Sequence, residues 1–135
     1  MTTLASACNA IQIAAGGVSG IKYAPEQPPE TPEDFPFVVT YPETFTGTIN
    51  TMEDFRMLYN ITVELHISRQ DLPVDVARLL AYAESFPNVI FKALKTNAIA
   101  ASGITGTFGA LEWGGIETIG YRWTVQNVKV ITNIT

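Results

Sequence analysis

One stretch decides the fold: Met57-Leu58-Tyr59-Asn60-Ile61-Thr62-Val63-Glu64-Leu65-His66-Ile67-Ser68. Its odd-numbered residues are all apolar, and its even-numbered residues are mostly polar. Successive side chains of a strand point to opposite faces, so this period of two predicts one long, half-buried strand. The only histidine, His66, falls on the polar face. We therefore expect an exposed side chain there, not a ligand or a catalytic base.

Two shorter alternating segments precede this strand. The first runs from Phe35 to Tyr41 and is bounded by Pro36 and Pro42, and the second runs from Phe45 to Thr51. We predict a strand for each. The second strand would form a hairpin with the long strand, and the connection would hold Met52, Glu53 and Asp54.

The residues before these strands predict a helix. Thr2 or Thr3 can cap its first turn, and Gly16-Gly17 ends it, because glycine tolerates a left-handed conformation after a helix. The spacing of its apolar residues predicts a buried stripe of Leu4, Cys8, Ile11 and Ala15.

A second helix is predicted after the long strand. Asp71 is a good cap, Pro73 fits the first turn, and Pro87 is expected to stop the helix. Asn88 would then cap a short further turn. The predicted buried stripe consists of Val76, Leu79, Leu80 and Ala83.

Two strands complete the chain as a hairpin around Gly114-Gly115. Ile119, Tyr121, Trp123 and Val125 share one face of the second strand. The apolar parity then shifts to Val128, which predicts a bulge near Gln126-Asn127. The whole chain, residues 1–135, is thus expected to be one α+β domain in the order α-β-β-β-α-β-β. Its sheet would be mostly antiparallel, with both helices on one face.

The segment 21–36 is rich in proline and predicts an extended, polyproline-like loop. It also begins an acidic region with seven acids and no base between Lys22 and Arg56. The loop is either a solvated segment or an arm that docks on a basic neighbour. Our candidate interface residues are Glu26, Glu30, Glu33, Asp34, Glu53, Asp54 and Trp113.

Composition excludes several classes of function. With 1 His and 1 Cys, the chain lacks the residues for a Cys/His zinc site and for an internal disulfide. A net charge of −5 argues against tight nucleic-acid binding, which requires many Lys and Arg residues. The uncharged residues 1–21 are interrupted by polar residues and glycines, so we expect neither a secretory signal nor a membrane span. We found no catalytic constellation and expect no cofactor, no metal and no enzyme activity.

The element order and three segments resemble a known family, the tail terminator or tail completion proteins of long-tailed bacteriophages, including the lambda-type terminator. The three segments are Phe35–Pro42, Val63–Arg69 together with Asp71-Leu72-Pro73, and Leu111–Tyr121. The likeness spans nearly the whole chain. It lies in fold and element order more than in fixed residues.

This resemblance implies a virion structural protein of the tail or neck, made in the host cytoplasm. Such proteins form a hexameric ring on the head-proximal end of the tail tube, stop its polymerisation and join the tail to the head connector. The expected partners are other copies of the chain, the tail tube protein and the connector or stopper protein. DNA would pass through the lumen without specific binding.

Two other classes remain open. One is a head-side neck protein, such as a stopper or head completion protein. The other is a ligand-binding α+β module or unusual enzyme that uses His66, which would need a deep pocket around that residue.

Overall fold

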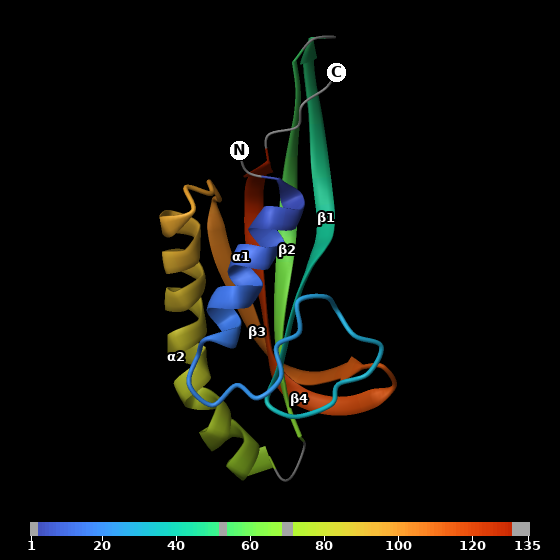
Figure 1. Cartoon of the computed structure of the whole chain (residues 1–135), viewed down its shortest axis with the longest axis vertical. Helices are drawn as coiled ribbons and strands as arrows, with labels where there is room; N and C mark the ends of the chain where they lie inside the picture. The colour runs from blue at the N-terminus through green and yellow to red at the C-terminus, as the bar shows by residue number, and fades with distance from the viewer. Residues whose placement is uncertain (1–2, 52–53, 69–71, 131–135) are drawn as a thin grey trace.

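A computed structural model describes residues 3–51, 54–68 and 72–130. Two helices and four strands follow one another in the order α1 (Leu4–Gly16), β1 (Phe37–Thr51), β2 (Asp54–Ile67), α2 (Leu72–Thr96), β3 (Gly103–Trp113) and β4 (Ile116–Val130). The strands form one antiparallel sheet in the order β1-β2-β4-β3, and both helices lie on the same side of it (Figure 1). The predicted α+β class is therefore confirmed.

The predicted division of residues 35–51 into two strands is wrong, because β1 is continuous. Pro42 lies within β1, opposite Ile61, and the register shifts immediately after it, between Pro42 and Thr44. A proline is tolerated at this position because β1 is an edge strand and the bulge absorbs the irregularity. The element order is consequently α-β-β-α-β-β.

The long strand predicted from its alternation is confirmed as β2. Its odd-numbered residues Ile61, Val63, Leu65 and Ile67 are fully buried beneath the helices. The expectation that the even-numbered face meets solvent is wrong at this end of the strand, because Thr62, Glu64 and His66 are buried as well. A second layer of side chains covers them, as described below.

Helix α1 begins and ends where the sequence predicts. The Thr3 side chain accepts a hydrogen bond from the Ser6 backbone, and the Ser6 side chain accepts one from the Thr3 backbone, which forms a capping box. Gly17 follows the helix with a φ of −80°, so the left-handed conformation expected there is absent. The buried residues are Ala7, Ile11, Gln12 and Ala15, whereas the predicted Leu4 and Cys8 are half-buried.

Helix α2 continues through Pro87 and does not stop there. A proline inside a helix removes one backbone hydrogen bond at a cost of about 3 kcal/mol. Burial of Phe86 and Ile90, on either side of Pro87, offsets this cost. Asn88 does not cap a new turn; its side chain donates a hydrogen bond to the Glu84 carbonyl oxygen. The cap predicted at Asp71 lies outside the described residues.

The buried stripe of α2 also differs from the predicted one. Leu79 is buried as expected, whereas Leu80 is 58% exposed and Val76 and Ala83 are half-buried. The core side of the helix is formed instead by Leu79, Phe86, Ile90, Ala93 and Leu94.

The β3–β4 hairpin and its bulge are confirmed. Gly114 and Gly115 have φ values of +60° and +80°, the left-handed pair that a tight two-residue hairpin turn requires. The β4 residues Gln126 and Asn127 together face Asn60 of β2, and Asn127 has a φ of +54°. The Asn60 side chain accepts a hydrogen bond from the Asn127 backbone at this bulge.

Candidate functional site

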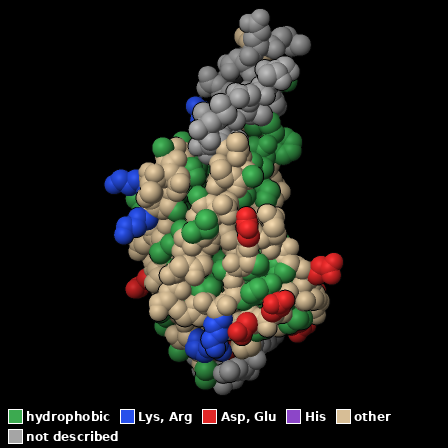
Figure 2. Space-filling model, in the orientation of Figure 1, with side chains coloured by type: hydrophobic (Ala, Val, Ile, Leu, Met, Phe, Trp, Pro, Cys, Tyr) green, Lys and Arg blue, Asp and Glu red, His purple; other side chains and the backbone are tan. Residues whose placement is uncertain are grey.

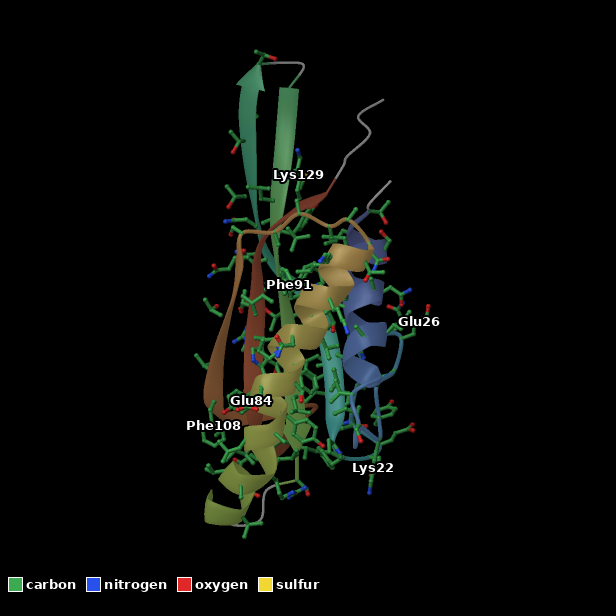
Figure 3. The ribbon with its side chains drawn as sticks, turned by 90° about the vertical axis from the view of Figure 1, so that its left-hand side faces the viewer. Lys22, Glu26, Glu84, Phe91, Phe108 and Lys129 are labelled. Carbon is green, nitrogen blue, oxygen red and sulfur yellow. The ribbon has the colours of Figure 1, made fainter. Side chains whose placement is uncertain are left out.

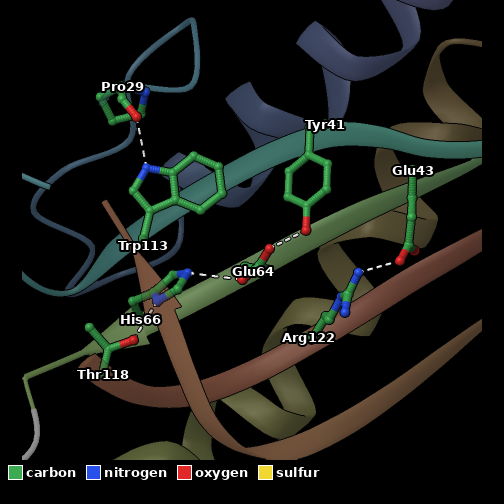
Figure 4. A network of polar contacts seen from close by, with 8 residues as sticks. All are labelled: Pro29, Tyr41, Glu43, Glu64, His66, Trp113, Thr118 and Arg122. Atoms are coloured by element: carbon green, nitrogen blue, oxygen red, sulfur yellow. Dashed lines mark hydrogen bonds and ion pairs between the residues drawn. The ribbon is translucent and has the colours of Figure 1, made fainter. Parts of the chain in front are cut away.

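A polar cluster lies on the side of the sheet opposite the helices (Figure 4). His66 is fully buried, with its Nδ1 2.5 Å from the Thr118 hydroxyl and its Nε2 3.2 Å from Glu64 Oε1. The other Glu64 oxygen accepts a hydrogen bond from the Tyr41 hydroxyl. The prediction of an exposed histidine is therefore wrong.

Long-range packing explains why His66 is buried. The β3–β4 hairpin brings Trp113 over the sheet, with its ring centroid 6.2 Å from that of His66 and 6.0 Å from that of Phe37. Phe37 also lies 5.4 Å from His66. These aromatic rings come from three different strands, so the period-two pattern of β2 alone gave no sign that its polar face would be covered.

The environment of Glu64 favours its charged form. Burial by itself would raise the pKa of Glu64, but the close contact with His66, the hydrogen bond from Tyr41 and the positive charge of Arg122 hold this pKa below its ordinary value. The contact between Glu64 and Tyr41 has the opposite effect on the pKa of Tyr41. Burial, with the hydrogen bond to Glu64, raises the pKa of Tyr41 well above its ordinary value.

A shallow groove of about 570 Å³ opens beside this cluster, lined by Tyr41, Glu64, Trp113, Glu117 and Arg122, among others. Arg122 forms an ion pair with Glu43 at its rim. His66 does not line the groove. A base at His66 would therefore be unable to reach a bound molecule in this conformation. No three His, Cys, Asp or Glu side chains within the described ranges are arranged to hold a metal ion.

The proline-rich segment 21–36, which we call the acidic loop, is not a free arm. The backbone N–H groups of Lys22 and Tyr23 donate hydrogen bonds to the Pro36 carbonyl oxygen, and the Val38 N–H donates one to the Tyr23 carbonyl oxygen. Both ends of the loop are thus closed against the start of β1. The Gln12 side chain also donates a hydrogen bond to the Pro25 carbonyl oxygen, which holds the loop beside α1.

The structure brings most of the candidate interface residues to one part of the surface. The indole of Trp113 donates a hydrogen bond to the Pro29 carbonyl oxygen at 2.7 Å, and a side chain at Gly114 would clash with the Glu30 carbonyl oxygen. Trp113 is half-buried, while the four loop acids Glu26, Glu30, Glu33 and Asp34 are exposed. Acidic side chains accordingly gather over the loop and the β3–β4 hairpin, at the lower right of Figure 2.

The remaining two candidate residues are Glu53 and Asp54. Glu53 is outside the described residues. Asp54 begins β2, and its backbone pairs with Thr51 at the far end of the β1–β2 hairpin, which extends well past both helices (Figure 1). The length of the hairpin therefore separates Asp54 from the acidic loop.

This projecting hairpin carries an apolar surface that neither α1 nor α2 covers among the described residues. Phe45 and Ile49 on β1 face the same side as Met57 and Tyr59 on β2, and this side continues the helix-covered face of the sheet. Phe45 is 61% exposed and Ile49 68% exposed. We call these four residues the hairpin strip.

A second apolar surface lies on the helices. A groove of about 370 Å³ between α1 and α2 has a largely apolar lining, and Ile13, one of its lining residues, is 68% exposed. Its lining residues are Ala10, Ile13, Ala14, Val89, Lys92, Ala93, Thr96 and Asn97, and we call it the helix groove. Phe91, which precedes Lys92 and lies on the outward side of α2, is 61% exposed (Figure 3).

The single cysteine belongs to neither surface. Cys8 is half-buried in α1, and burial raises the pKa of its thiol to about 11. A thiol in this state is a weak nucleophile near neutral pH, as expected for a residue that packs against the core.

Comparison with known proteins gives no assignment, since neither any protein-family model nor any curated protein matches the chain. Neither helix among the described residues has the length and apolar character that crossing a bilayer requires. The function is therefore inferred from the hairpin strip, the helix groove and the acidic loop, together with the resemblance of the sequence to tail terminator proteins.

Proposed function

We propose that this protein is a virion structural protein that assembles into a ring, caps the head-proximal end of a phage tail tube and joins the tail to the head connector. The ring would stop further polymerisation of the tube. Its partners would be other copies of the chain, the tube protein and the connector or stopper protein. DNA would pass through the lumen without specific binding.

One observation carries this proposal: within the part of the chain that the structure describes, two unlike apolar surfaces are left uncovered, the hairpin strip and the helix groove. A closed ring is built from head-to-tail contacts, in which each subunit presents two different complementary surfaces. Isolated exposed apolar side chains are ordinary, but two large ones, Phe45 and Ile49, beside the half-buried Met57 and Tyr59 on a projecting hairpin indicate a contact surface.

The acidic loop supports the second part of the proposal, the joining of two assemblies. Its four exposed acids are presented by a loop that is held at both ends and anchored by Trp113. A preorganised charged surface of this kind suits docking on a basic partner, since little conformational entropy is lost on binding. A head-side neck protein would use such a loop equally well, so the partner must be identified by experiment.

The alternative of a ligand-binding module or enzyme that uses His66 receives less support. It requires an accessible pocket around His66, whereas this side chain is fully buried between Phe37, Trp113 and Thr118. The His66→Ala substitution would also disturb this packing. Glu64→Gln is therefore a cleaner test, because a ligand module would lose binding while a terminator would keep ring formation.

The experiment that tests the proposal is tube growth in the presence of the purified protein. Tail tube protein is polymerised with and without it, and tube lengths are measured by negative-stain microscopy. A terminator shortens the tubes and stops growth when it is added during polymerisation. Unchanged tube growth, with the protein binding to portal rings instead, would support the head-side neck protein.

A further inference from the structure

We infer that the outer edge of β3 is a site of strand addition, at which the β3 strand of a second copy pairs in antiparallel fashion and extends the sheet. The occupant is thus a second copy of this chain, and the contact has two-fold symmetry. A ring is built from head-to-tail contacts instead, so this inference goes beyond the proposed function.

The backbone of β3 carries the first step. β3 is an edge strand, and Trp113 and Ile116 pair on either side of the two-residue turn at its end. Residues that flank such a turn bond to each other, and bonding alternates along an antiparallel pair. The odd-numbered residues of β3 therefore bond to β4, and the even-numbered residues direct their N–H and C=O groups away from the sheet. Among the described residues, no hydrogen bond from another segment reaches the backbone of residues 104–110.

The two edges of the sheet differ in their protection. On β1, Tyr23 pairs with Phe37 at the start of the strand, and Pro42 with the register shift after it interrupts the middle. On β3, residues 103–111 include no proline and no charged residue, and their pairing with β4 has no register shift. Edge strands usually carry such features because these prevent pairing with another chain. An edge without them is suited to receiving a strand.

The sequence of β3 selects a second copy as the partner. With Thr107 opposite Thr107 of the second copy, each Phe108 lies opposite a Gly106, and each Thr105 lies opposite a Gly109. This register places large side chains against glycines and pairs two threonines, which is a favourable cross-strand pair. The uncharged stretch also lets two chains of net charge −5 meet without like charges opposite each other.

The helix side of this edge offers an apolar surface to Phe108 of the second copy. Phe108 is 41% exposed on β3 (Figure 3) and contacts Tyr121 edge-on, and Tyr121 stacks on Trp123. The Trp123 indole leans over Gly106, with its nearest atom 2.6 Å from the position that a Cβ would take there. A Phe108 ring placed opposite Gly106 therefore meets this indole and lengthens the row of aromatic rings.

Cysteine pairing tests this register in the full-length protein. In a Cys8→Ser background, Thr107→Cys should give a covalent homodimer on oxidation. Directly opposite residues that share no hydrogen bonds have Cα atoms about 4.5 Å apart, which a disulfide can span. Thr105→Cys, an exposed threonine on the same face of β3, is the matched control and should not cross-link to itself. Mixed with Gly109→Cys it should cross-link, since a Cβ at Gly109 has no neighbour within 4 Å.

A charge at the two-fold axis provides a second, independent measurement. Thr107→Lys places two like charges opposite each other and should weaken dimerisation by about tenfold or more, as measured by sedimentation equilibrium over a concentration series. Thr46→Lys, which changes an exposed threonine on the other edge strand, is the control and should leave dimerisation unchanged. Circular dichroism verifies that both variants are folded.

The outcomes separate this inference from the proposed function. Equal cross-linking of Thr107→Cys and Thr105→Cys, or a wild-type protein that is monomeric at every concentration, would overturn the β3 contact. A cross-link from Thr107→Cys to the tube protein alone would overturn the assignment of the occupant. Capped tubes without the Thr107 cross-link would overturn the contact and leave the terminator proposal standing. The cross-link in a protein that does not affect tube growth would support the contact and remove the terminator proposal.

Discussion

The Trp113 indole Nε1 lies 2.7 Å from the carbonyl oxygen of Pro29, and this hydrogen bond joins the end of β3 to the acidic loop. The two residues are 84 positions apart in the chain. The same indole ring makes edge contacts with the rings of Phe37 and His66. Figure 4 shows the indole beside His66. One side chain therefore both closes the polar side of the sheet and positions the loop that we propose as a docking surface.

Trp113→Phe should release the loop while preserving the fold. The substitution removes the hydrogen bond to Pro29 and keeps an aromatic ring beside His66, so we expect a loss of about 0.5–1.5 kcal/mol in the free energy of unfolding. Hydrogen exchange should increase selectively in residues 24–36. Trp123→Phe is the control, because Trp123 stacks on Phe86 in the core and its loss should not affect the loop selectively. Equal exchange in the loop of wild type and Trp113→Phe would contradict this role.

Charge reversal of the loop tests docking directly. Replacing Glu26, Glu30, Glu33 and Asp34 by lysine should weaken binding to the connector or tube and leave the fold intact, because all four side chains are exposed. Binding is measured by co-sedimentation with each partner. The reversal of Glu84, an exposed acid on α2 away from this surface, serves as the control for a change of charge elsewhere. Unchanged binding to both partners would remove the loop from the proposal.

Polar substitution in β2 should unfold the chain. Val63 is fully buried beneath the helices, and Val63→Asp would lose roughly 1.5–3 kcal/mol of apolar burial and bury a carboxyl group in addition. Urea denaturation followed by tryptophan fluorescence measures the loss. Thr46→Asp, an exposed change on β1, should have a small effect. A stable, ring-forming Val63→Asp would show that the faces of the strand are assigned the wrong way round.

Acid should remove the contribution of Glu64 to stability. Its pKa in the folded protein lies below its ordinary value, so the charged group stabilises the fold above about pH 4.3, the pKa of an unperturbed glutamate, and loses this effect as the pH falls further. The stability difference between wild type and Glu64→Gln should therefore shrink between pH 5 and about pH 3. Glu84→Gln, an exposed change on α2, is the control. A stability difference between wild type and Glu64→Gln that grows towards low pH would contradict this prediction.

The Cys8 thiol should react slowly in the folded protein. Burial raises its pKa to about 11, so only a small fraction is thiolate at pH 8, and labelling should accelerate as the pH rises towards that value. The measurement is the rate of reaction with a chromogenic disulfide reagent, compared with the same protein in urea. Equally fast labelling in both states at pH 8 would contradict the half-buried position of Cys8 in α1.

The fold was predictable where the pattern is local. The alternation of β2, the capping of α1 by Thr3, the Gly114-Gly115 turn and the bulge at Gln126-Asn127 each depend on a few neighbouring residues, and each is confirmed. The errors at Pro42 and Pro87 share one cause. The rule that proline interrupts an element gives way where the proline lies on an edge strand or where neighbouring residues are buried.

The polar cluster was not predictable from local patterns. His66, Thr118 and Trp113 meet because the β3–β4 hairpin folds over β2, and the residue separation between His66 and Thr118 is 52. A period-two pattern indicates which residues share a face and does not indicate what covers that face. The sequence predicts that residues 21–36 form a loop. The hydrogen bonds that close this loop at Tyr23 and the one that Trp113 donates to it depend on the same long-range packing, so local patterns do not predict them.

The most direct test of the central claim is the mass of the purified protein alone and after mixing with short tail tubes, with negative-stain images of the tube ends. The account predicts a six-fold ring on one end of each tube and no further tube growth. A protein that remains monomeric and leaves both tube ends bare and growing would contradict it.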